Sequence, residues 1–247
     1  MQIVGQLQEP ADYRAFIPEA PRTVENKNKM TKPSKIFAAA ALLLALFINS
    51  FAASAAEPAV VDAFKSAPQT LIPLLQNSAR LDMLDYFNSG LDTPTSNLIN
   101  GKSRIVELSD RSMKIDLTPA STLQIMVLPA ANKEYFATIS TIATPAQDSK
   151  LTIYSSDWQQ TLTDKLFRTP QLKDWLTPEG RKMLKEIEIQ VPFTLVSYDY
   201  NPDTQSLILH NNTSSILSRE DYEDLKPMMI ETLEYRWNGK KFEAVKQ

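Results

Sequence analysis

The sequence predicts an α+β fold in which helices are followed by an antiparallel meander, and then by helices with further antiparallel hairpins. Apolar residues first recur at helical spacing, and the period changes to two from Arg104 onward. A second group of helical and strand segments follows residue 160. The gaps between strand segments are short, which favours antiparallel neighbours because parallel strands need long crossover connections. Helices, sheet, helices and sheet in this order indicate an α+β protein.

The first 56 residues are excluded from the fold because they contain the pattern of an export signal. Lysines precede the uncharged run Ile36–Ile48, and Ala53-Ser54-Ala55 supplies the small residues of a cleavage site, with the cut before Ala56 or one residue later. The run is shorter than the roughly 20 apolar residues of a spanning helix, so no membrane span is expected after cleavage.

The signal begins inside the chain, because Met30 opens a normal basic leader. Residues 1–29 are therefore expected to be a mis-assigned gene start or a disordered extension, and residues 30–56 the signal peptide. Residues 57–247 are predicted to be a single α+β domain, or two lobes at 57–160 and 161–247.

Charge and composition limit the classes of partner. The net charge is −3 and no basic run is present, which argues against nucleic acid as a partner. The chain contains no cysteine, so disulfides, thiolate metal sites and a lipidated cysteine are excluded. The expected product is a soluble protein in the periplasm or outside the cell.

Two helices are expected first. Pro58 precedes a helix at Ala59–Ser66. A second helix, about Ala79–Ser89, begins after Asn77-Ser78 and stops at Gly90. Its predicted buried stripe has i, i+3, i+6 spacing and consists of Leu81, Leu84 and Phe87.

Strands follow in the first half. Met113, Ile115 and Leu117 alternate with Lys114 and Asp116, which predicts a strand with one face in water. The next segment alternates Leu123, Ile125 and Val127 with Thr122, Gln124 and Met126. Further strands are expected at Tyr135–Ala143 and Leu151–Ser155, with turn residues between them.

The second half begins with short helices. Thr169-Pro170 and Thr177-Pro178 are each typical of a helix N-cap followed by proline. A hairpin at Phe193–Tyr200 and Gln205–His210 follows, and Ser218 with Asp221 predicts a capped short helix.

Asn238-Gly239 predicts a final hairpin with a two-residue turn. That turn would pair Trp237 with Lys240 and Tyr235 with Phe242.

Most catalytic signatures are absent from the sequence. The glycines of 57–247 are too far apart for a phosphate-binding loop, and no G-x-S-x-G is present. The lone His210 cannot form a two-histidine zinc site, and its position at a strand end favours a surface residue. No cofactor and no metal are predicted.

Two acidic segments have simple structural explanations. Asp199–Asp203 has the D-x-N-x-D start of a calcium loop, but the later positions of that loop are occupied by Thr204 and His210, which favours a hairpin turn. Asp82 and Asp85 lie three apart on one helical face, where a solvated surface is favoured over an acid–base pair.

Four aromatic residues are the candidate binding surface: Tyr154, Trp158, Tyr198 and Tyr200. If exposed, their rings can stack on a sugar or contact a peptide, whereas burial would make them core residues. Burial in the core is the favoured interpretation.

Several blocks of the sequence resemble a known family. They are PLLQNSARLDMLDYFNSG, NLINGKSRIVELSDRSMKIDLTPASTLQIMVLP, KLTIYSSDW and YRWNGKKF. Together they resemble an uncharacterised, exported domain-of-unknown-function family of anaerobic gut and mouth bacteria. The resemblance covers nearly all of 57–247. It implies export and a single architecture, and it supplies no functional residues.

Two functions remain possible from the sequence. The first is a soluble, non-catalytic envelope protein that binds another protein or a glycan. The second is a hydrolase that uses Asp82 or Asp85 with an acid from the second half, which requires the two carboxyl groups to converge in one cleft.

Overall fold

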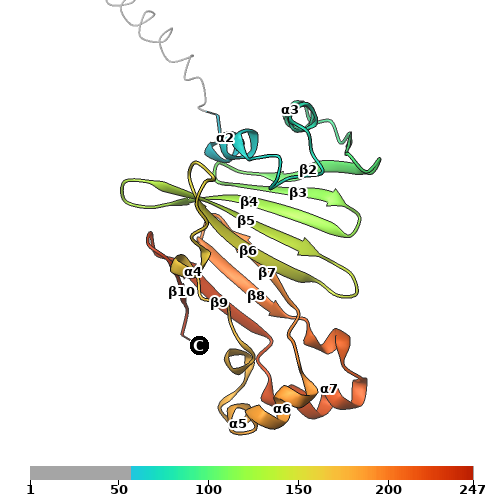
Figure 1. The fold of residues 1–247 in the computed structure, drawn as a ribbon, viewed down its shortest axis with the longest axis vertical. Helices are drawn as coiled ribbons and strands as arrows, with labels where there is room; N and C mark the ends of the chain where they lie inside the picture. The colour runs from blue at the N-terminus through green and yellow to red at the C-terminus, as the bar shows by residue number, and fades with distance from the viewer. Residues whose placement is uncertain (1–56, 247) are drawn as a thin grey trace, which may run out of the picture. The chain divides into compact units, whose positions relative to one another are not determined.

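The computed structural model describes residues 57–246, which contain two antiparallel sheets (Figure 1). The six-stranded sheet follows the chain in the order β1 (Thr95–Ser96), β2 (Lys102–Leu108), β3 (Ser112–Thr118), β4 (Ser121–Pro129), β5 (Glu134–Ile142) and β6 (Asp148–Ser155). The four-stranded sheet has the order β10-β9-β8-β7 and consists of β7 (Val196–Asn201), β8 (Ser206–Asn211), β9 (Thr232–Trp237) and β10 (Phe242–Ala244). The predicted α+β class with an antiparallel meander is confirmed.

Helical segments precede the first sheet and flank the second. The helices are α2 (Ala59–Ser66), α3 (Asn77–Asn88), α4 (Thr163–Leu166), α5 (Pro178–Lys182), α6 (Leu184–Gln190) and α7 (Arg219–Leu225). The predicted cleavage residues Ala53, Ala55 and Ala56 lie outside the described residues. The described residues fall within one compact unit at 55–247, and the division into two lobes stays a prediction.

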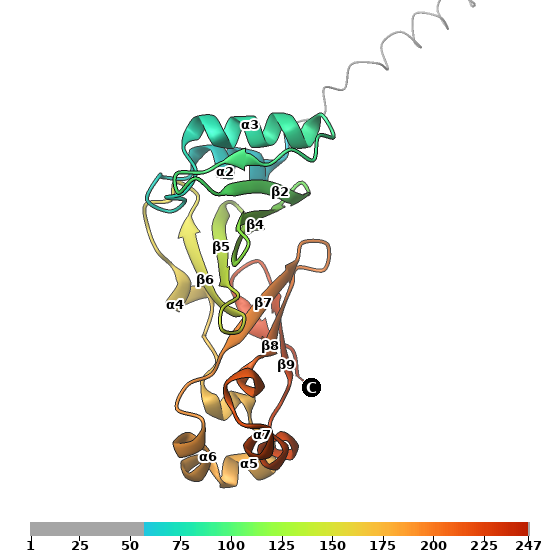
Figure 2. The same ribbon diagram turned by 90° about the vertical axis from the view of Figure 1, so that its right-hand side faces the viewer.

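Two cores lie on opposite faces of the six-stranded sheet (Figure 2). On one face, α2 and α3 pack against a cluster that we call the helix-side core, which includes Phe64, Leu75, Ile115, Ile125 and Trp158. On the other face lies the sheet-side core, shared with the four-stranded sheet, which includes Met126, Ile153, Phe167, Tyr200, Tyr235, Trp237 and Phe242. A smaller cluster joins α6 and α7 and includes Leu176, Ile187, Val191, Leu225 and Met229.

Strand β4 is buried on both faces, which sequence alternation alone did not predict. Ile125 belongs to the helix-side core, and the neighbouring Met126 is fully buried in the sheet-side core. Gln124 is also buried, and its Nε2 donates to the Tyr200 carbonyl of β7 and to Ser112 Oγ. The four-stranded sheet therefore covers the face of β4 that the alternation pattern predicts to be exposed to water.

Helix α3 begins two residues earlier than predicted and buries a different stripe. Leu81 is 49% exposed, so its assignment to the core was wrong, whereas Met83 and Leu84 are buried. Arg80 is buried beside them and donates to the carbonyls of Phe64, Ala67 and Leu75. The first two carbonyls lie at the C-terminal end of α2, where helix carbonyls lack intrahelical donors and attract a cation.

The free edge of β2 is short and irregular. β1 pairs only with Lys102 and Ser103. A register shift between Ile105 and Glu107 then interrupts the pairing with β3. The side chains of Arg104 and Glu107 on this edge are exposed.

Helix starts in the second half agree only partly with the prediction. Thr177 Oγ1 accepts a hydrogen bond from the Gly180 amide, which confirms this residue as the N-cap of α5. Thr169-Pro170 does not begin a helix; a 3-10 turn at Leu172–Trp175 follows the N-cap Gln171. Ser218 caps α7 as predicted, through the Asp221 amide.

The last hairpin has a longer loop than predicted. Trp237 lies opposite Phe242 rather than Lys240, and Tyr235 opposite Ala244. The side chain of Asn238 accepts hydrogen bonds from the amides of Lys240 and Lys241, which stabilises a four-residue loop. This register places both Trp237 and Phe242 in the sheet-side core.

Candidate functional site

The four predicted aromatic residues do not form an exposed surface. Trp158 is 6% exposed and packs against Phe136 and Tyr154, with ring centroids 4.9 and 5.2 Å apart, in the helix-side core. Tyr198 and Tyr200 belong to the sheet-side core on the opposite face of the six-stranded sheet. The sheet separates the two pairs, and the burial of Trp158 and Tyr200 agrees with the favoured interpretation of these residues as core.

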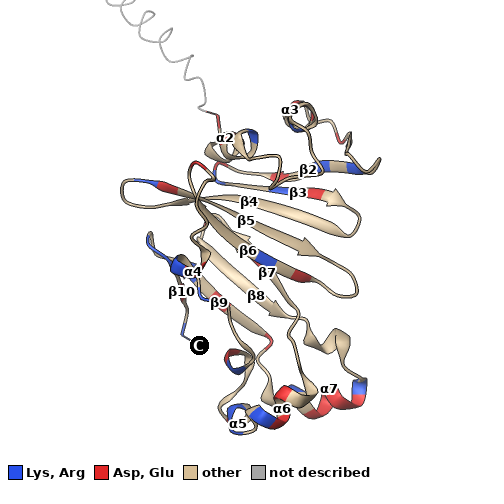
Figure 3. Cartoon of the chain, in the orientation of Figure 1, with Lys and Arg blue, Asp and Glu red and all other residues tan. Residues whose placement is uncertain are grey.

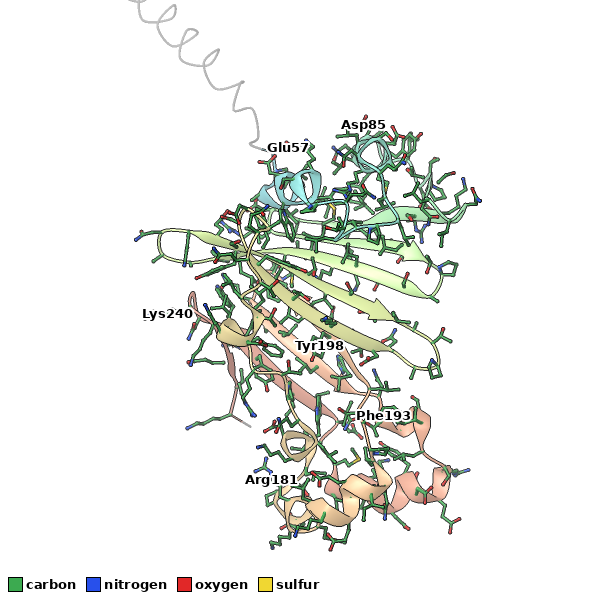
Figure 4. All side chains as sticks on the ribbon, in the orientation of Figure 1. Glu57, Asp85, Arg181, Phe193, Tyr198 and Lys240 are labelled. Atoms are coloured by element: carbon green, nitrogen blue, oxygen red, sulfur yellow. The ribbon has the colours of Figure 1, made fainter. Side chains whose placement is uncertain are left out.

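Burial changes the chemistry of the two tyrosines on β7. Loss of hydration raises the pKa of Tyr198 and of Tyr200 to about 12. Both hydroxyls therefore stay neutral over the physiological range. Tyr198 lies edge-on to the ring of Phe167, with centroids 6.1 Å apart (Figure 4).

The predicted carboxylates do not converge. Asp82 and Asp85 are both exposed on α3, and Asp85 points outward from the helix (Figure 4). Asp82 lines a hollow of about 410 Å³ between α3 and β1, where it is the only carboxylate among the described lining residues. No described residue after 160 lines this hollow. His210 is exposed on β8, opposite Ser197 and Thr232.

The acidic stretch at the β7–β8 connection is a turn. Asn201 Oδ1 accepts hydrogen bonds from the amides of Asp203 and Thr204, which closes the loop. Within residues 57–246, no group of three or more His, Cys, Asp or Glu is arranged to hold a metal ion. No helix in the same range is long and apolar enough to cross a membrane.

A groove between α3 and β2 is the main candidate site, and we call it the α3–β2 groove. It has a volume of about 440 Å³ and is lined by Phe87, Gly90, Leu91, Asp92, Arg104, Ile105 and Val106. Gly90 ends α3 with φ of +67°, and its amide and that of Leu91 donate to the carbonyls of Phe87 and Tyr86. This turn directs the chain back along β2 and leaves Leu91 53% exposed at the groove.

One guanidinium dominates the polar side of the groove. Arg104 Nη1 donates to Asp92 Oδ1 at 2.8 Å, and its Nε lies 3.4 Å from Asp116 Oδ2. The hydrogen bond and negative charge of Asp92, with a contribution from Asp116, raise the pKa of Arg104. Asp92, the only acid among the described residues that line the groove, is thus held in an ion pair, and the remaining lining is mostly apolar.

Sequence reasoning did not find this groove. Leu91 and Arg104 belong to no chemical motif, and they meet only because β1 and β2 pair as a short hairpin beside α3. An apolar residue directly after the terminating Gly90 is no signal in itself, because that position commonly contacts the last turn of the helix.

Fold and groove together define an α+β protein with a side-chain groove and without a recognisable catalytic constellation in the described residues. Residues 52–242 match the model of the family described as "Protein of unknown function (DUF3256)". The chain belongs to this family. No curated protein matches it.

One solved structure shares the fold. It is a domain of an uncharacterized protein from Porphyromonas gingivalis W83, 16% identical, with a TM-score of 0.66. The similarity covers 76% of this chain and 98% of that one. At this identity the likeness shows the fold alone.

Proposed function

We propose that this chain is an exported, non-catalytic binding protein that holds a protein or glycan partner in the α3–β2 groove. One observation carries the proposal: Leu91 is 53% exposed at a groove whose other apolar lining residues are Phe87, Ile105 and Val106. Exposed apolar side chains around a hollow typically mark an interaction site. Aliphatic side chains favour a polypeptide segment over a sugar as the partner.

The hydrolase alternative has no support in this region. A glycosidase requires two carboxyl groups about 5–9.5 Å apart, one of them free to act as an acid. Asp92 in the groove is paired with Arg104, and Asp82 lines its hollow without a second acid. We therefore assign binding rather than bond cleavage to this site.

The edge of β2 argues for recognition through side chains. Strand addition needs a regular row of free amides and carbonyls. Here the register shift between Ile105 and Glu107 and the charges of Arg104 and Glu107 interrupt that row. A partner would insert apolar side chains beside Leu91 and Phe87 instead.

Export is tested by the N-terminus of the protein recovered from its own host. Mass spectrometry of the envelope and culture fractions should find a chain that begins at Ala56 or Glu57. A chain that keeps residues 30–56 and stays in the cytosol would contradict export.

Binding is tested by crosslinking in the envelope fraction, comparing Leu91→Asp with a control. Leu91→Asp should reduce the recovery of a specific partner at least about tenfold, because it places a charge in the apolar groove. Ile189→Asp is the matched control, since Ile189 is 83% exposed on α6 and does not line the groove. Equal loss in both variants, or no loss in either, would contradict the proposal.

A further inference from the structure

A second hollow lies between α4 and the β9–β10 hairpin, and we call it the α4–β10 hollow. Its volume is about 380 Å³, within the range of small-molecule sites, about 300–1,000 Å³. It is lined by Asp164, Lys165, Leu166, Phe167, Arg168, Tyr235, Lys241, Phe242, Glu243 and Ala244. It shares no lining residue with the α3–β2 groove.

The floor of this hollow is apolar and rigid. Phe167, Tyr235 and Phe242 are each less than a tenth exposed. The ring of Phe167 lies edge-on to Tyr235 and Phe242, with centroids 5.2 and 6.0 Å apart. Such edge-to-face packing fixes the rings and presents a preformed surface.

The rim is cationic. Lysine and arginine residues lie along α4 and the β9–β10 hairpin, whereas α7 is mostly acidic (Figure 3). Lys165, Arg168 and Lys241 line the hollow and are exposed. Three acids lie near them: Asp174 binds Arg168 Nη2 at 2.8 Å, Glu243 lies 3.3 Å from Lys241, and Asp164 is a lining residue.

Two donors at the hollow have no acceptor. Among the described residues, Lys165 has no ion-pair partner, and the hydroxyl of Tyr235 makes no hydrogen bond. Tyr235 is 6% exposed as a residue, but its hydroxyl is not among the fully buried atoms without a partner, so the hydroxyl is open to the hollow that Tyr235 lines. Burial, together with the nearby negative charge of Asp174, raises the pKa of Tyr235, and the hydroxyl stays a hydrogen-bond donor at neutral pH. Both donors are therefore available to a ligand that enters the hollow.

We propose that the α4–β10 hollow binds a small carboxylate-bearing ligand, with Tyr235 and Lys165 as its donors and the aromatic floor against its carbon skeleton. The charged residues around the hollow favour a ligand that carries a single negative charge. Asp164 and Glu243 offset two of the three lining cations, which leaves one surplus positive charge, enough for a monovalent ligand rather than a doubly charged phosphate. A monovalent carboxylate supplies two acceptor oxygens at a lower charge.

The test is a titration of the ¹⁵N-labelled protein with glucuronate, glutarate monoamide and inorganic phosphate, followed by NMR. We expect saturable shifts at 164–168 and 241–244 with either carboxylate, and a dissociation constant on the order of 1 mM for so small a ligand. Tighter binding of glucuronate would identify a sugar acid as the source, and tighter binding of the monoamide an acidic peptide residue. Either result supports the proposal.

Three variants distinguish binding in the hollow from nonspecific attraction to surface charge. Tyr235→Phe keeps the ring packing and should weaken binding about tenfold, because it removes one hydrogen bond to a charged group. Lys165→Gln should weaken it by a similar factor. Lys240→Gln is the matched control on the same hairpin, outside the lining, and should change affinity less than about twofold.

Three results would overturn the proposal: shifts with phosphate alone, no saturable shift with any probe at about 50 mM, or equal affinity in Tyr235→Phe and the unaltered protein. Tyr235→Phe must keep the amide spectrum of the sheet-side core, which shows that it folds. Because the two hollows share no residue, failure here leaves the α3–β2 groove unaffected.

Discussion

The two faces of the six-stranded sheet carry cores of different composition. The helix-side core buries three aromatic residues, Phe64, Phe136 and Trp158, among mostly aliphatic side chains. The sheet-side core buries seven, which are Tyr135, Phe167, Trp175, Tyr200, Tyr235, Trp237 and Phe242. The partner layer explains this difference, because facing sheets lie about 10 Å apart and large rings from both can interdigitate. Helices approach through ridges of aliphatic side chains and bring carbonyl ends that need donors.

The helix-side core meets that need with Arg80, whereas the sheet-side core pairs its carbonyls with the side chains of Trp237 and Gln124. Trp237 Nε1 donates to the Pro129 carbonyl at 2.6 Å, and Gln124 bridges the two sheets. Each layer pairing therefore requires its own kind of polar residue. Four predictions test this contrast, from the largest expected effect to the smallest.

Trp237→Ala should lower the free energy of unfolding by about 3–5 kcal/mol, because it removes a buried ring and leaves a cavity. Trp237 contacts Tyr135 and Phe242 at centroid distances of 5.9 and 5.3 Å. Urea unfolding followed by circular dichroism measures the change. Trp237→Phe keeps part of the ring packing and should cost less. A loss below about 1 kcal/mol for Trp237→Ala would show that the rings are not the main support of this core.

Alkaline pH should weaken the sheet-side core selectively. Tyr200 has a folded-state pKa of about 12 against an ordinary value of 10.0. The unfolded chain loses this proton first, so stability is complete below pH 10 and falls as the pH rises from about 10 to 12. The full two-unit difference corresponds to roughly 2–3 kcal/mol.

Tyr200→Phe should flatten the stability profile between pH 10 and 12 and change stability little at pH 8, as measured by urea unfolding across that range. An unchanged slope in this variant would assign the alkaline loss to other groups. Tyr198, whose pKa is also about 12, is the next residue to substitute.

Arg80→Met should lower the free energy of unfolding by about 1–3 kcal/mol, because it leaves the carbonyls of Phe64, Ala67 and Leu75 without their donor. The methionine fills most of the space, so the loss reports the hydrogen bonds rather than a cavity. Hydrogen exchange should show faster opening of α2 than of β7. Arg80→Lys, which keeps the charge but not the fork of donors, should recover only part of the stability.

Gly90→Ala and Gly239→Ala should each lower the free energy of unfolding by about 1 kcal/mol, because both glycines adopt positive φ, +67° and +83°. An added Cβ meets no atom within 4 Å at either position, so the cost is confined to the backbone. The two values should agree, although one glycine follows the helix-side layer and the other the sheet-side hairpin. Thermal unfolding of both variants checks this, and a large difference would point to packing at one of the loops.

Local sequence patterns predicted the elements well wherever the structure of a residue depends mainly on its neighbours in sequence. Strands β3 to β6 were found from alternation, and Thr177 and Ser218 from capping chemistry. Leu81 and Met126 are residues whose degree of burial the local patterns did not predict. Alternation identifies the two faces of β4, but only the position of β7 and β8 decides that Met126 is covered. Helical spacing was compatible with a buried Leu81. The buried position is occupied by Arg80 instead, because its guanidinium donates to carbonyls at the end of α2.

The final hairpin shows a similar competition. Asn238-Gly239 favours a two-residue turn, yet burial of both Trp237 and Phe242 as a facing pair requires the longer loop. The candidate sites were harder still. The α3–β2 groove and the α4–β10 hollow combine residues from separate elements, and none of these residues has a spacing that signals chemistry. Tyr154, Trp158, Tyr198 and Tyr200 were visible as candidates because they are aromatic, and the fold places them in its cores.

The interrupted edge of β2 has a consequence for handling the protein at high concentration. A straight, uncharged outer strand would be a template on which further molecules add end to end, in the manner of amyloid growth. The register shift after Ile105 and the charges of Arg104 and Glu107 remove that template. Straightening this strand and neutralising its charges would turn a protected sheet edge into a seed for fibres.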